Sequence, residues 1–268
     1  MMMSFLLEFT YRVPSSLLLN TMSVFIAGIL ANGGISELMG KSLPYSKFWD
    51  AAGGQKSDRE PKKFSGRTGM LIAYVPAFMV SILSLIIFPD TTLRILLIKS
   101  ILAVHFFKRI LEVLFVHKYS GPMPLEAAIL ISSSYFNATT CMIYAQHLTL
   151  GSPDPAIDLK LCGFLLFPIG ISGNFYHHLL LSRMRKDGEK GYKLPVGCLF
   201  DLITCPHYLF EIIVFWGVFC ISQTLLSLIF ALGTTFLLIG RSCATRRWYI
   251  TKFDDFPNNV KAIIPFIL

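Results

Sequence analysis

Seven apolar runs, each close to the length of a membrane-crossing helix, alternate with polar segments along the chain. A helix needs roughly 20 mainly apolar residues to cross a bilayer. The runs are residues 15–35, 69–88, 92–116, 124–148, 156–181, 206–222 and 223–240. Only Ser222, Gln223 and Thr224 form a polar pause between the last two, so we expect a tight helical hairpin there. The pattern predicts an all-α, polytopic membrane bundle of seven transmembrane helices, forming a single membrane domain over residues 1–268.

The polar segments between the runs alternate in charge. Cations gather in the segment 37–68, at the end of the third run, after the fifth run and in the C-terminal tail. The segments after the second, fourth and sixth runs are acidic or neutral. Because basic loops stay in the cytosol, this alternation predicts a luminal or exterior N-terminus and a cytosolic C-terminus. Arg94 and Lys99 are exceptions, since both fall in the outer half of the third run.

The composition favours a membrane protein over a soluble one. Of the 268 residues, 54% are hydrophobic and 15% are charged, and the mean hydropathy is +0.60. A soluble domain carries about a quarter charged residues. The net charge of +8 could suggest nucleic acid, but most cations lie in loops where membrane topology explains them. We therefore expect membrane lipids, and no nucleic acid, as partners.

Three other kinds of signal are missing from the sequence. The six cysteines form no C-x-x-C pair, and most lie in or beside apolar runs, so we expect neither a zinc site nor a disulfide framework. The first residues lack a basic n-region and an obvious cleavage site, so the first run is expected to act as its own insertion signal. No G-x-G-x-x-G or G-x-x-x-x-G-K-[ST] motif occurs, so any nucleotide must be held without a Rossmann turn or a P-loop.

The segment 173–211 concentrates polar chemistry between two apolar runs. Its polar side chains include Asn174, His177, His178, Arg183, Arg185, Lys186, Lys193, His207, Tyr208 and Glu211. Polar groups at the edge of a bilayer are costly and are therefore functional candidates. The cations among them suit a phosphate-bearing partner.

Each of these residues also has a plainer interpretation. Arg183 and Arg185 could simply mark the cytosolic end of a span. Asn174 favours a functional site over a simple span end, because a buried amide needs hydrogen-bond partners. It also shares a helical face with His178, one turn away. His177 and His178 could ligate a metal. No pair of histidines brackets a Glu at the H-E-x-x-H spacing, however, so we expect no metal site.

The third run carries two cations and a carboxylate inside its apolar sequence. Glu112 lies one turn after Lys108, so an internal ion pair fits the spacing. Lys108 and Arg109 facing the bundle interior, toward a phosphate or a carbonyl, fits it equally well. Tyr74 lies near the beginning of the second run, and a tyrosine near either end of a span is more often an interfacial anchor than an acid.

Two further features leave alternatives open. Glu211 lies five residues after Pro206, and a carboxylate at this depth is expected only if it accepts hydrogen bonds from a ligand or another residue. The basic and aromatic residues from Arg246 to Tyr249 could form an interfacial belt. They could also close over a nucleotide from the cytosolic side.

Dispersed motifs in residues 155–268 resemble the steroid 5α-reductase family. The matching pieces are Gly173-Asn174, Leu181 to Lys186, Tyr192 to Pro195, Gly197 to Phe200, Cys205 to Tyr208 with Glu211, Trp248-Tyr249 and Lys261 to Ile267. Lys108-Arg109-x-x-Glu112, followed by Phe115-Val116-His117, is more similar to the very-long-chain enoyl-CoA reductases. The resemblance implies a multi-span, NADPH-dependent enzyme of the endoplasmic reticulum that reduces a carbon–carbon double bond conjugated to a carbonyl.

The same resemblance assigns roles to residues of this chain. It makes 155–268 the cofactor-binding half, with the candidate residues Asn174, His178, Arg185, Lys193, His207, Glu211, Arg246 and Tyr249. In the implied reaction a hydride passes from NADPH to the β-carbon, and the developing enolate oxygen needs a hydrogen-bond donor. We expect Tyr74 or Tyr208 to be that donor, with Lys108 and Arg109 nearby.

The substrate half departs from the steroid-reducing members. The resemblance implies that they carry Glu where Tyr74 stands and Tyr where Phe106 stands, and that these two groups hold the steroid 3-ketone. They also carry Asp at the place of His178 and often Asn at that of His207. Three functions therefore stay open: a 3-oxo-Δ4-steroid reductase, a trans-2-enoyl-CoA reductase of fatty-acid elongation, and a non-catalytic membrane lipid-binding protein. The first two take a steroid or an enoyl-CoA as lipid substrate.

Overall fold

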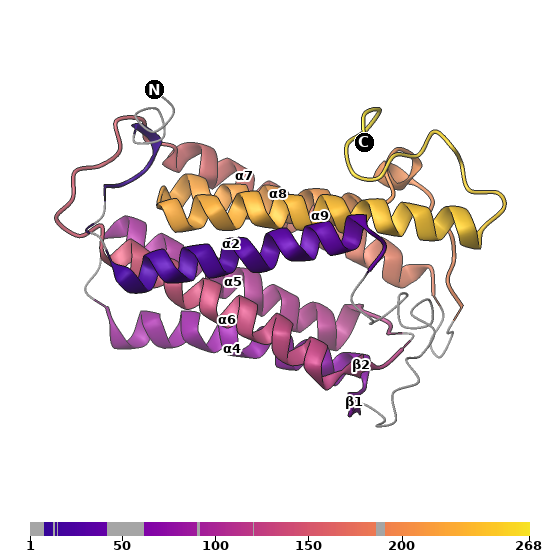
Figure 1. Cartoon of the computed structure of the whole chain (residues 1–268), viewed down its shortest axis with the longest axis horizontal. Coiled ribbons are helices and arrows are strands. Elements are labelled where there is room, and N and C mark those ends of the chain that lie inside the picture. Colours follow the sequence, from indigo (N-terminus) through magenta and orange to yellow (C-terminus); the bar gives the residue numbers. More distant parts are fainter. Residues whose placement is uncertain are drawn as a thin grey trace.

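The structure, a computed structural model, describes residues 8–12, 14, 16–41, 62–89, 92–119, 121–185 and 191–268. Each predicted run corresponds to one helix of this part of the chain. The helices are α2 (Leu17–Leu38), α4 (Gly66–Ile87), α5 (Leu93–Leu111), α6 (Leu125–His147), α7 (Lys160–Arg183), α8 (Pro206–Ser222) and α9 (Leu225–Lys252). They lie side by side along the long axis of the molecule (Figure 1). The all-α class is thus confirmed for the described residues.

Four of these helices, α2, α4, α7 and α9, are long and apolar enough to cross a membrane. Helix α8 is also apolar but has 17 residues. Helix α5 is less apolar because it contains the four cations Arg94, Lys99, Lys108 and Arg109. The four long helices make the chain a polytopic integral membrane protein.

Short elements complete the fold. The π-helical turn η1 (Glu112–Val116) continues α5, and the 3₁₀ turn η2 (Cys198–Asp201) precedes α8. Strands β1 (Lys63–Phe64) and β2 (Met123–Pro124) pair antiparallel, with Phe64 opposite Met123. Residues 42–61 of the predicted basic segment lie outside the described residues.

The predicted hairpin between the last two helices is confirmed. Gln223 ends α8 in the left-handed conformation, with φ 50° and ψ 32°. Thr224 then caps α9, because its hydroxyl accepts a hydrogen bond from the Ser227 amide. One left-handed residue followed by an N-cap reverses the chain within two positions. Helices α8 and α9 consequently run antiparallel, side by side (Figure 1).

The predicted end of the last run, residue 240, was wrong, since α9 continues to Lys252. The prediction stopped where cations begin, but two of those cations find partners on α2. Arg241 is buried and pairs with Glu37 at 2.5 Å. Arg247 donates to the backbone oxygens of Glu37 and Leu38, at 2.8 and 3.0 Å. These carbonyls form the C-terminal end of α2, where a cation is favourable.

Glycines allow the backbones of α7 and α8 to touch. A Cβ at Gly170 would lie 2.7 Å from the Val214 nitrogen, and a Cβ at Gly217 would lie 2.8 Å from the Phe167 nitrogen. Both distances are too short for a side chain. Small residues at a helix crossing are the usual route to close packing in membranes, and this crossing fixes the relative position of Asn174 and Glu211.

Arg94, one of the two exceptional cations, is buried at the end of the bundle that holds the α8–α9 turn. Its guanidinium donates to the Ile221 backbone oxygen at 2.8 Å, to Gln223 Oε1 at 2.9 Å and to Asp158 Oδ1 at 2.9 Å. Gln223 in turn donates to the Ile157 backbone oxygen at 2.8 Å. Arg94 therefore joins α5 to the start of α7 and to the α8–α9 turn.

Lys99, the other exception, binds backbone oxygens at the C-terminal end of α4. Its ammonium donates to the backbone oxygens of Ser84 and Phe88, at 3.0 and 2.8 Å. A cation at the C-terminal end of a helix is stabilised by the helix dipole. Both exceptions to the charge alternation are thus paired structural cations.

We expect Arg94→Met to lower the free energy of unfolding by about 2 kcal/mol, because hydrogen bonds to charged groups are worth about 1.5–3 kcal/mol. Thermal and denaturant unfolding in detergent would measure the loss. Lys160→Met is the matched control, since it removes only the partly exposed 3.2 Å ion pair with Asp158. Such a pair is worth about 0–1 kcal/mol. Equal losses in the two variants would contradict the role given to Arg94.

Candidate active site

A cavity of about 610 Å³ opens between the helices. Ligand sites in proteins usually enclose about 300–1,000 Å³. The predicted site residues that line the cavity are Tyr74, Arg109, Asn174, His178, Arg185, Lys193, His207, Tyr208, Glu211 and Tyr249. They come from five helices and from the segments after α7. The fold therefore brings residues from distant parts of the sequence to one space.

Lys108 lies behind this lining and supports it. Its ammonium pairs with Glu112 Oε1 at 2.8 Å and also donates to Asn174 Oδ1. With its oxygen occupied, the Asn174 amide donates from Nδ2 to Glu211 Oε2 at 2.9 Å and to the His207 backbone oxygen at 2.8 Å. The buried amide has the partners that burial requires, and it links α5, α7 and α8 at the cavity wall.

Arg109 connects the cavity to a buried carboxylate. Its Nη2 donates to the Tyr74 hydroxyl at 2.6 Å, and its Nη1 donates to Glu112 Oε2 at 2.9 Å. Glu112 Oε1 lies 2.9 Å from His178 Nδ1. The predicted internal ion pair of Lys108 with Glu112 is therefore confirmed, and Arg109 also lines the cavity. The π-helical turn begins at Glu112, and such turns are frequent at functional sites.

One group of side chains resembles a metal site. Ligand atoms of Glu112, His117 and His178 all lie within 4.8 Å of one another. The Glu112 carboxylate is already paired with Lys108 and Arg109, so a metal ion would meet two positive charges there. We assign no metal to this cluster. The sequence did not indicate this cluster, because Glu112 and His117 at the two ends of η1 lie about 60 residues before His178 on α7.

His177 has a packing role. Its Nδ1 lies 2.7 Å from the Gly173 backbone oxygen, and its ring stacks on Phe210 with 5.2 Å between centroids. This contact joins α7 to α8 beside the cavity. His177 therefore contributes to the helix crossing and is not part of the cavity lining.

The cationic part of the lining lies where α7 ends. Arg185 and Lys118 bond to each other's backbone oxygens, at 3.2 and 2.7 Å. The Arg185 guanidinium also lies over the Tyr192 ring, 4.3 Å from its centroid. Lys193 lines the cavity beside them. The paired contacts fix the backbone around two cations, as binding of an anionic group would require.

Two neutral groups line the cavity next to these cations. Burial raises the pKa of Tyr119, and the Tyr119 hydroxyl has no hydrogen-bond partner among the described residues. Burial and the neighbouring His178 lower the pKa of His117. Both side chains are therefore neutral near pH 7. The Tyr119 hydroxyl is available to a polar ligand.

Arg246 is a predicted cofactor residue that the structure directs away from the cavity. It donates to the backbone oxygens of Val260 and Asn258, at 2.7 and 3.1 Å, and it does not belong to the cavity lining. These bonds hold the C-terminal segment against α9. The sequence could not indicate this, because the partners are backbone atoms.

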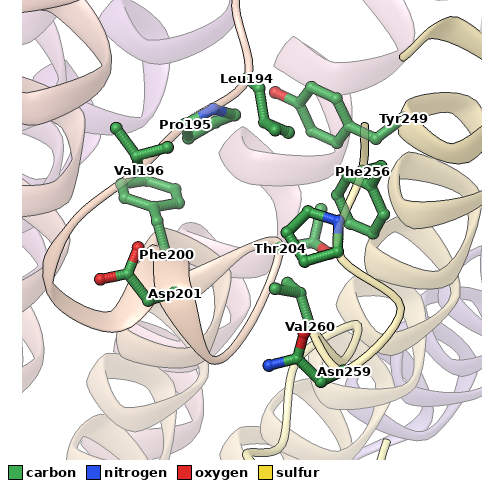
Figure 2. Close-up of a pocket in the computed structure, with 11 residues that line it drawn as sticks. Leu194, Pro195, Val196, Phe200, Asp201, Thr204, Tyr249, Phe256, Asn259 and Val260 are labelled. Carbon is green, nitrogen blue, oxygen red and sulfur yellow. The ribbon is translucent and has the colours of Figure 1, made fainter. Parts of the chain in front are cut away.

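A smaller cavity of about 310 Å³ lies beside the C-terminal segment. Figure 2 shows Tyr249 and Phe256 on one side of it and Phe200 on the other. Tyr249 stacks on Phe256 with 5.9 Å between ring centroids. Tyr249 and Thr204 line both this cavity and the main cavity. These two residues form the wall between the cavities.

Sequence reasoning missed a polar stripe on α9. Thr234, Arg241 and Thr245 line the main cavity together with Tyr249. Their spacings of seven, four and four residues keep them on one helical face. That periodicity, which continues past the end of the predicted run at residue 240, was the signal that could have revealed them.

Comparisons with known proteins agree with the motifs of this site. The model of the family described as 3-oxo-5-alpha-steroid 4-dehydrogenase matches residues 122–268, more than half of the chain. The chain is 34% identical over 168 residues to the very-long-chain enoyl-CoA reductase of Dictyostelium discoideum, covering 62% of this chain and 56% of that protein. It is 34% identical over 166 residues to 3-oxo-5-alpha-steroid 4-dehydrogenase 1 of Macaca fascicularis, covering 61% and 63%. It is 41% identical over 108 residues to the steroid 5-alpha-reductase DET2 of Gossypium hirsutum, covering 40% and 42%.

The matched stretches span less than two thirds of each of these relatives. The stretch matched by the family model, residues 122–268, includes the cavity-lining residues on α7, α8 and α9. The predicted resemblance is confirmed by the family model, which begins before α6 and continues to the last residue. The chain belongs to the 3-oxo-5-alpha-steroid 4-dehydrogenase family, the steroid 5α-reductases, a family of NADPH-dependent oxidoreductases.

Proposed function

We propose that this protein uses NADPH to reduce a carbon–carbon double bond conjugated to a carbonyl in a lipid, with a 3-oxo-Δ4-steroid as substrate. One observation carries the proposal. Asn174, Arg185, Glu211 and Tyr249, which the resemblance assigns to the cofactor, come from separate segments and line a single cavity. A decayed or non-catalytic relative would have no need to keep this arrangement.

The residues of the cavity fit a dinucleotide. Arg185 and Lys193 offer positive charge for phosphates, and Tyr119 offers a buried hydroxyl with no partner among the described residues. Asn174 and Glu211, already joined by a hydrogen bond, provide polar atoms deeper in the cavity. When bound, NADPH supplies the hydride that is added to the β-carbon of the substrate.

The further residues proposed to hold NADPH are His178, His207 and Tyr249, which all line the cavity. Arg246 is left out of this set because its guanidinium is bound to the C-terminal segment. Residues 155–268 therefore supply most of the proposed cofactor contacts. Tyr119 and the proposed catalytic residues Tyr74 and Arg109 come from the preceding part of the chain.

The protein's own side chains would act on the carbonyl oxygen of the substrate. Negative charge develops there as the hydride adds, and a fixed donor at that point is usually the largest catalytic contribution. Tyr74 and Tyr208 both line the cavity. Tyr74 is favoured because the positive charge of Arg109 lies beside its oxygen. A proton must then reach the α-carbon to complete the reduction.

A trans-2-enoyl-CoA reductase is the second candidate. It is favoured by the Lys108, Arg109 and Glu112 motif, and by Tyr74 and Phe106 at the positions that differ from the steroid-reducing members. Both candidates share the cofactor and the bond that is reduced. They differ in the group that carries the carbonyl, a ring ketone or a thioester.

A substrate panel with purified protein tests the proposal. We expect NADPH consumption that depends on an added Δ4-3-keto steroid and exceeds consumption with a trans-2-enoyl-CoA. A reversed preference would favour the second candidate. NADPH consumption that no enone stimulates would contradict both and support a non-catalytic lipid-binding protein.

We also propose that all seven helices cross the membrane, with the C-terminus in the cytosol and the protein in the endoplasmic reticulum. The seven helices and the alternating charge of the segments between them support this topology. In this orientation the cations beside the cavity face the cytosol.

A further inference from the structure

The first turns of α8 carry several residues of the main cavity. His207, Tyr208 and Glu211 all line it, and the helix itself begins at Pro206. The first backbone N–H groups of a helix have no partner within that helix, so a helix start is held by groups outside it. Where these three side chains lie therefore depends on what holds the chain just before α8.

The C-terminal segment after α9 holds that part of the chain, because the two segments run parallel and exchange backbone hydrogen bonds. The Thr204 amide and the Thr204 hydroxyl both donate to the Lys261 backbone oxygen, at 2.8 and 2.9 Å. The Cys205 amide donates to the Ala262 backbone oxygen at 3.2 Å. In the other direction, the Lys261 amide donates to the Leu202 backbone oxygen at 2.9 Å. The last residues before α8 are thus fixed by the end of the chain.

Arg246 ties the same C-terminal segment to α9. Its Nε donates to the Val260 backbone oxygen at 2.7 Å, and its Nη2 donates to the Asn258 backbone oxygen at 3.1 Å. Val260 directly precedes Lys261, whose oxygen binds Thr204. Figure 2 shows Val260 and Thr204 beside the same small cavity. One side chain of α9 therefore reaches the backbone before α8 through a single short stretch of the C-terminal segment.

The start of α8 has a second support, which comes from α7. The Asn174 amide donates to the His207 backbone oxygen at 2.8 Å and to Glu211 Oε2 at 2.9 Å. Side chains that hold a ligand need supporting contacts that keep them within about 0.5 Å of the productive position. Without the C-terminal segment, Asn174 would have to hold this end of α8 with fewer contacts, and the residues on it would be placed less exactly.

We propose that Arg246 is a positioning residue for the NADPH site, which acts through the C-terminal segment to fix the start of α8 and, with it, His207 and Glu211. The inference rests on the proposed function, because it takes these two residues as cofactor contacts. Tyr74 and Arg109 belong to α4 and α5, outside this chain of hydrogen bonds. Arg246 therefore governs the affinity for NADPH and leaves the chemistry at the substrate oxygen unchanged.

The test is Arg246→Met in the purified full-length protein. We expect the Kd for NADPH to rise about tenfold, the loss that corresponds to one hydrogen bond to a charged group. The kcat at saturating NADPH should stay within about twofold of wild type, because the bound cofactor restores the position of α8. Amide hydrogen exchange without NADPH should become faster in residues 202–208 as well as in residues 258–263. Arg246→Lys keeps a cation that can donate to one of the two oxygens, so its Kd should be intermediate.

The matched control is Arg247→Met, at the next residue of α9. Arg247 also donates to two backbone oxygens, but these belong to Glu37 and Leu38 of α2. This variant should leave the NADPH Kd and the exchange of residues 202–208 unchanged. A common effect of removing a cation from α9 would raise the Kd equally in both variants and would overturn the assignment.

The exchange measurement separates the two proposals, since it needs no reductase activity. Unchanged exchange of residues 202–208 in Arg246→Met would overturn the link from Arg246 to α8. Faster exchange with an unchanged Kd, or a lower kcat with an unchanged Kd, would overturn the role in cofactor binding while leaving the proposed function in place. A wild-type protein that does not bind NADPH would overturn the proposed function and the assignment with it.

Discussion

Replacing Tyr74 with Phe is expected to lower kcat by about 10²–10³-fold, the usual cost of losing a donor to a developing oxyanion. The affinity for NADPH should stay unchanged. The Tyr74 oxygen accepts a 2.6 Å hydrogen bond from Arg109, whose guanidinium carbon lies 4.9 Å from the ring centroid. This nearby positive charge favours partial transfer of the phenol proton to the substrate oxygen. NADPH consumption gives kcat, and titration of NADPH gives its Kd.

Two variants sharpen the interpretation of that loss. Tyr208→Phe removes the phenol of the other candidate donor and should cost much less. Arg109→Lys keeps the charge but loses the planar fork that bonds Tyr74 and Glu112 together, so its kcat should lie between wild type and Tyr74→Phe. A large loss in Tyr208→Phe with little change in Tyr74→Phe would transfer the donor role to Tyr208.

The helices were predictable because lipid imposes a simple rule on sequence. Mainly apolar length indicated all seven α-helices of the described residues, including α5 with its four cations, and the pause at Gln223 indicated the hairpin. The same rule failed at the end of α9, where Arg241 and Arg247 are satisfied by Glu37 and Leu38 about 200 positions earlier. Pairing across such a separation leaves no mark in local hydropathy.

The site was predictable where resemblance supplied it and less so where geometry alone decides. Asn174 and Glu211 were named from motifs, and the cavity brings them into direct contact. Arg246 was named in the same way, yet its guanidinium binds backbone oxygens elsewhere. The cavity-lining residues Thr234, Arg241 and Thr245 were missed because single polar residues in or just after an apolar run are common, and only the fold shows that they share one cavity.

The second large effect is expected at Glu112, a buried carboxylate that is 1% exposed and pairs with the cavity-lining Arg109. Its two oxygens accept from Lys108 at 2.8 Å, from Arg109 at 2.9 Å and from His178 Nδ1 at 2.9 Å. Glu112→Leu would leave two cations in the interior without their shared counter-charge. Removing one partner of a buried ion pair costs about 3–5 kcal/mol, so we expect a loss of this size in the free energy of unfolding, measured in detergent.

The sharpest check on that expectation is a combined variant. Adding Lys108→Met to Glu112→Leu removes one uncompensated cation, and apolar replacements of buried pairs are often tolerated, so part of the lost stability should return. Glu126→Gln, at an exposed carboxylate on α6, should change stability by less than about 0.5 kcal/mol. If adding Lys108→Met made the Glu112→Leu protein still less stable, the result would contradict the idea that Glu112 stabilises the protein by balancing the buried charges. In that case the contact of Lys108 with Asn174 would be the more important role of the lysine, because it aligns the amide with Glu211.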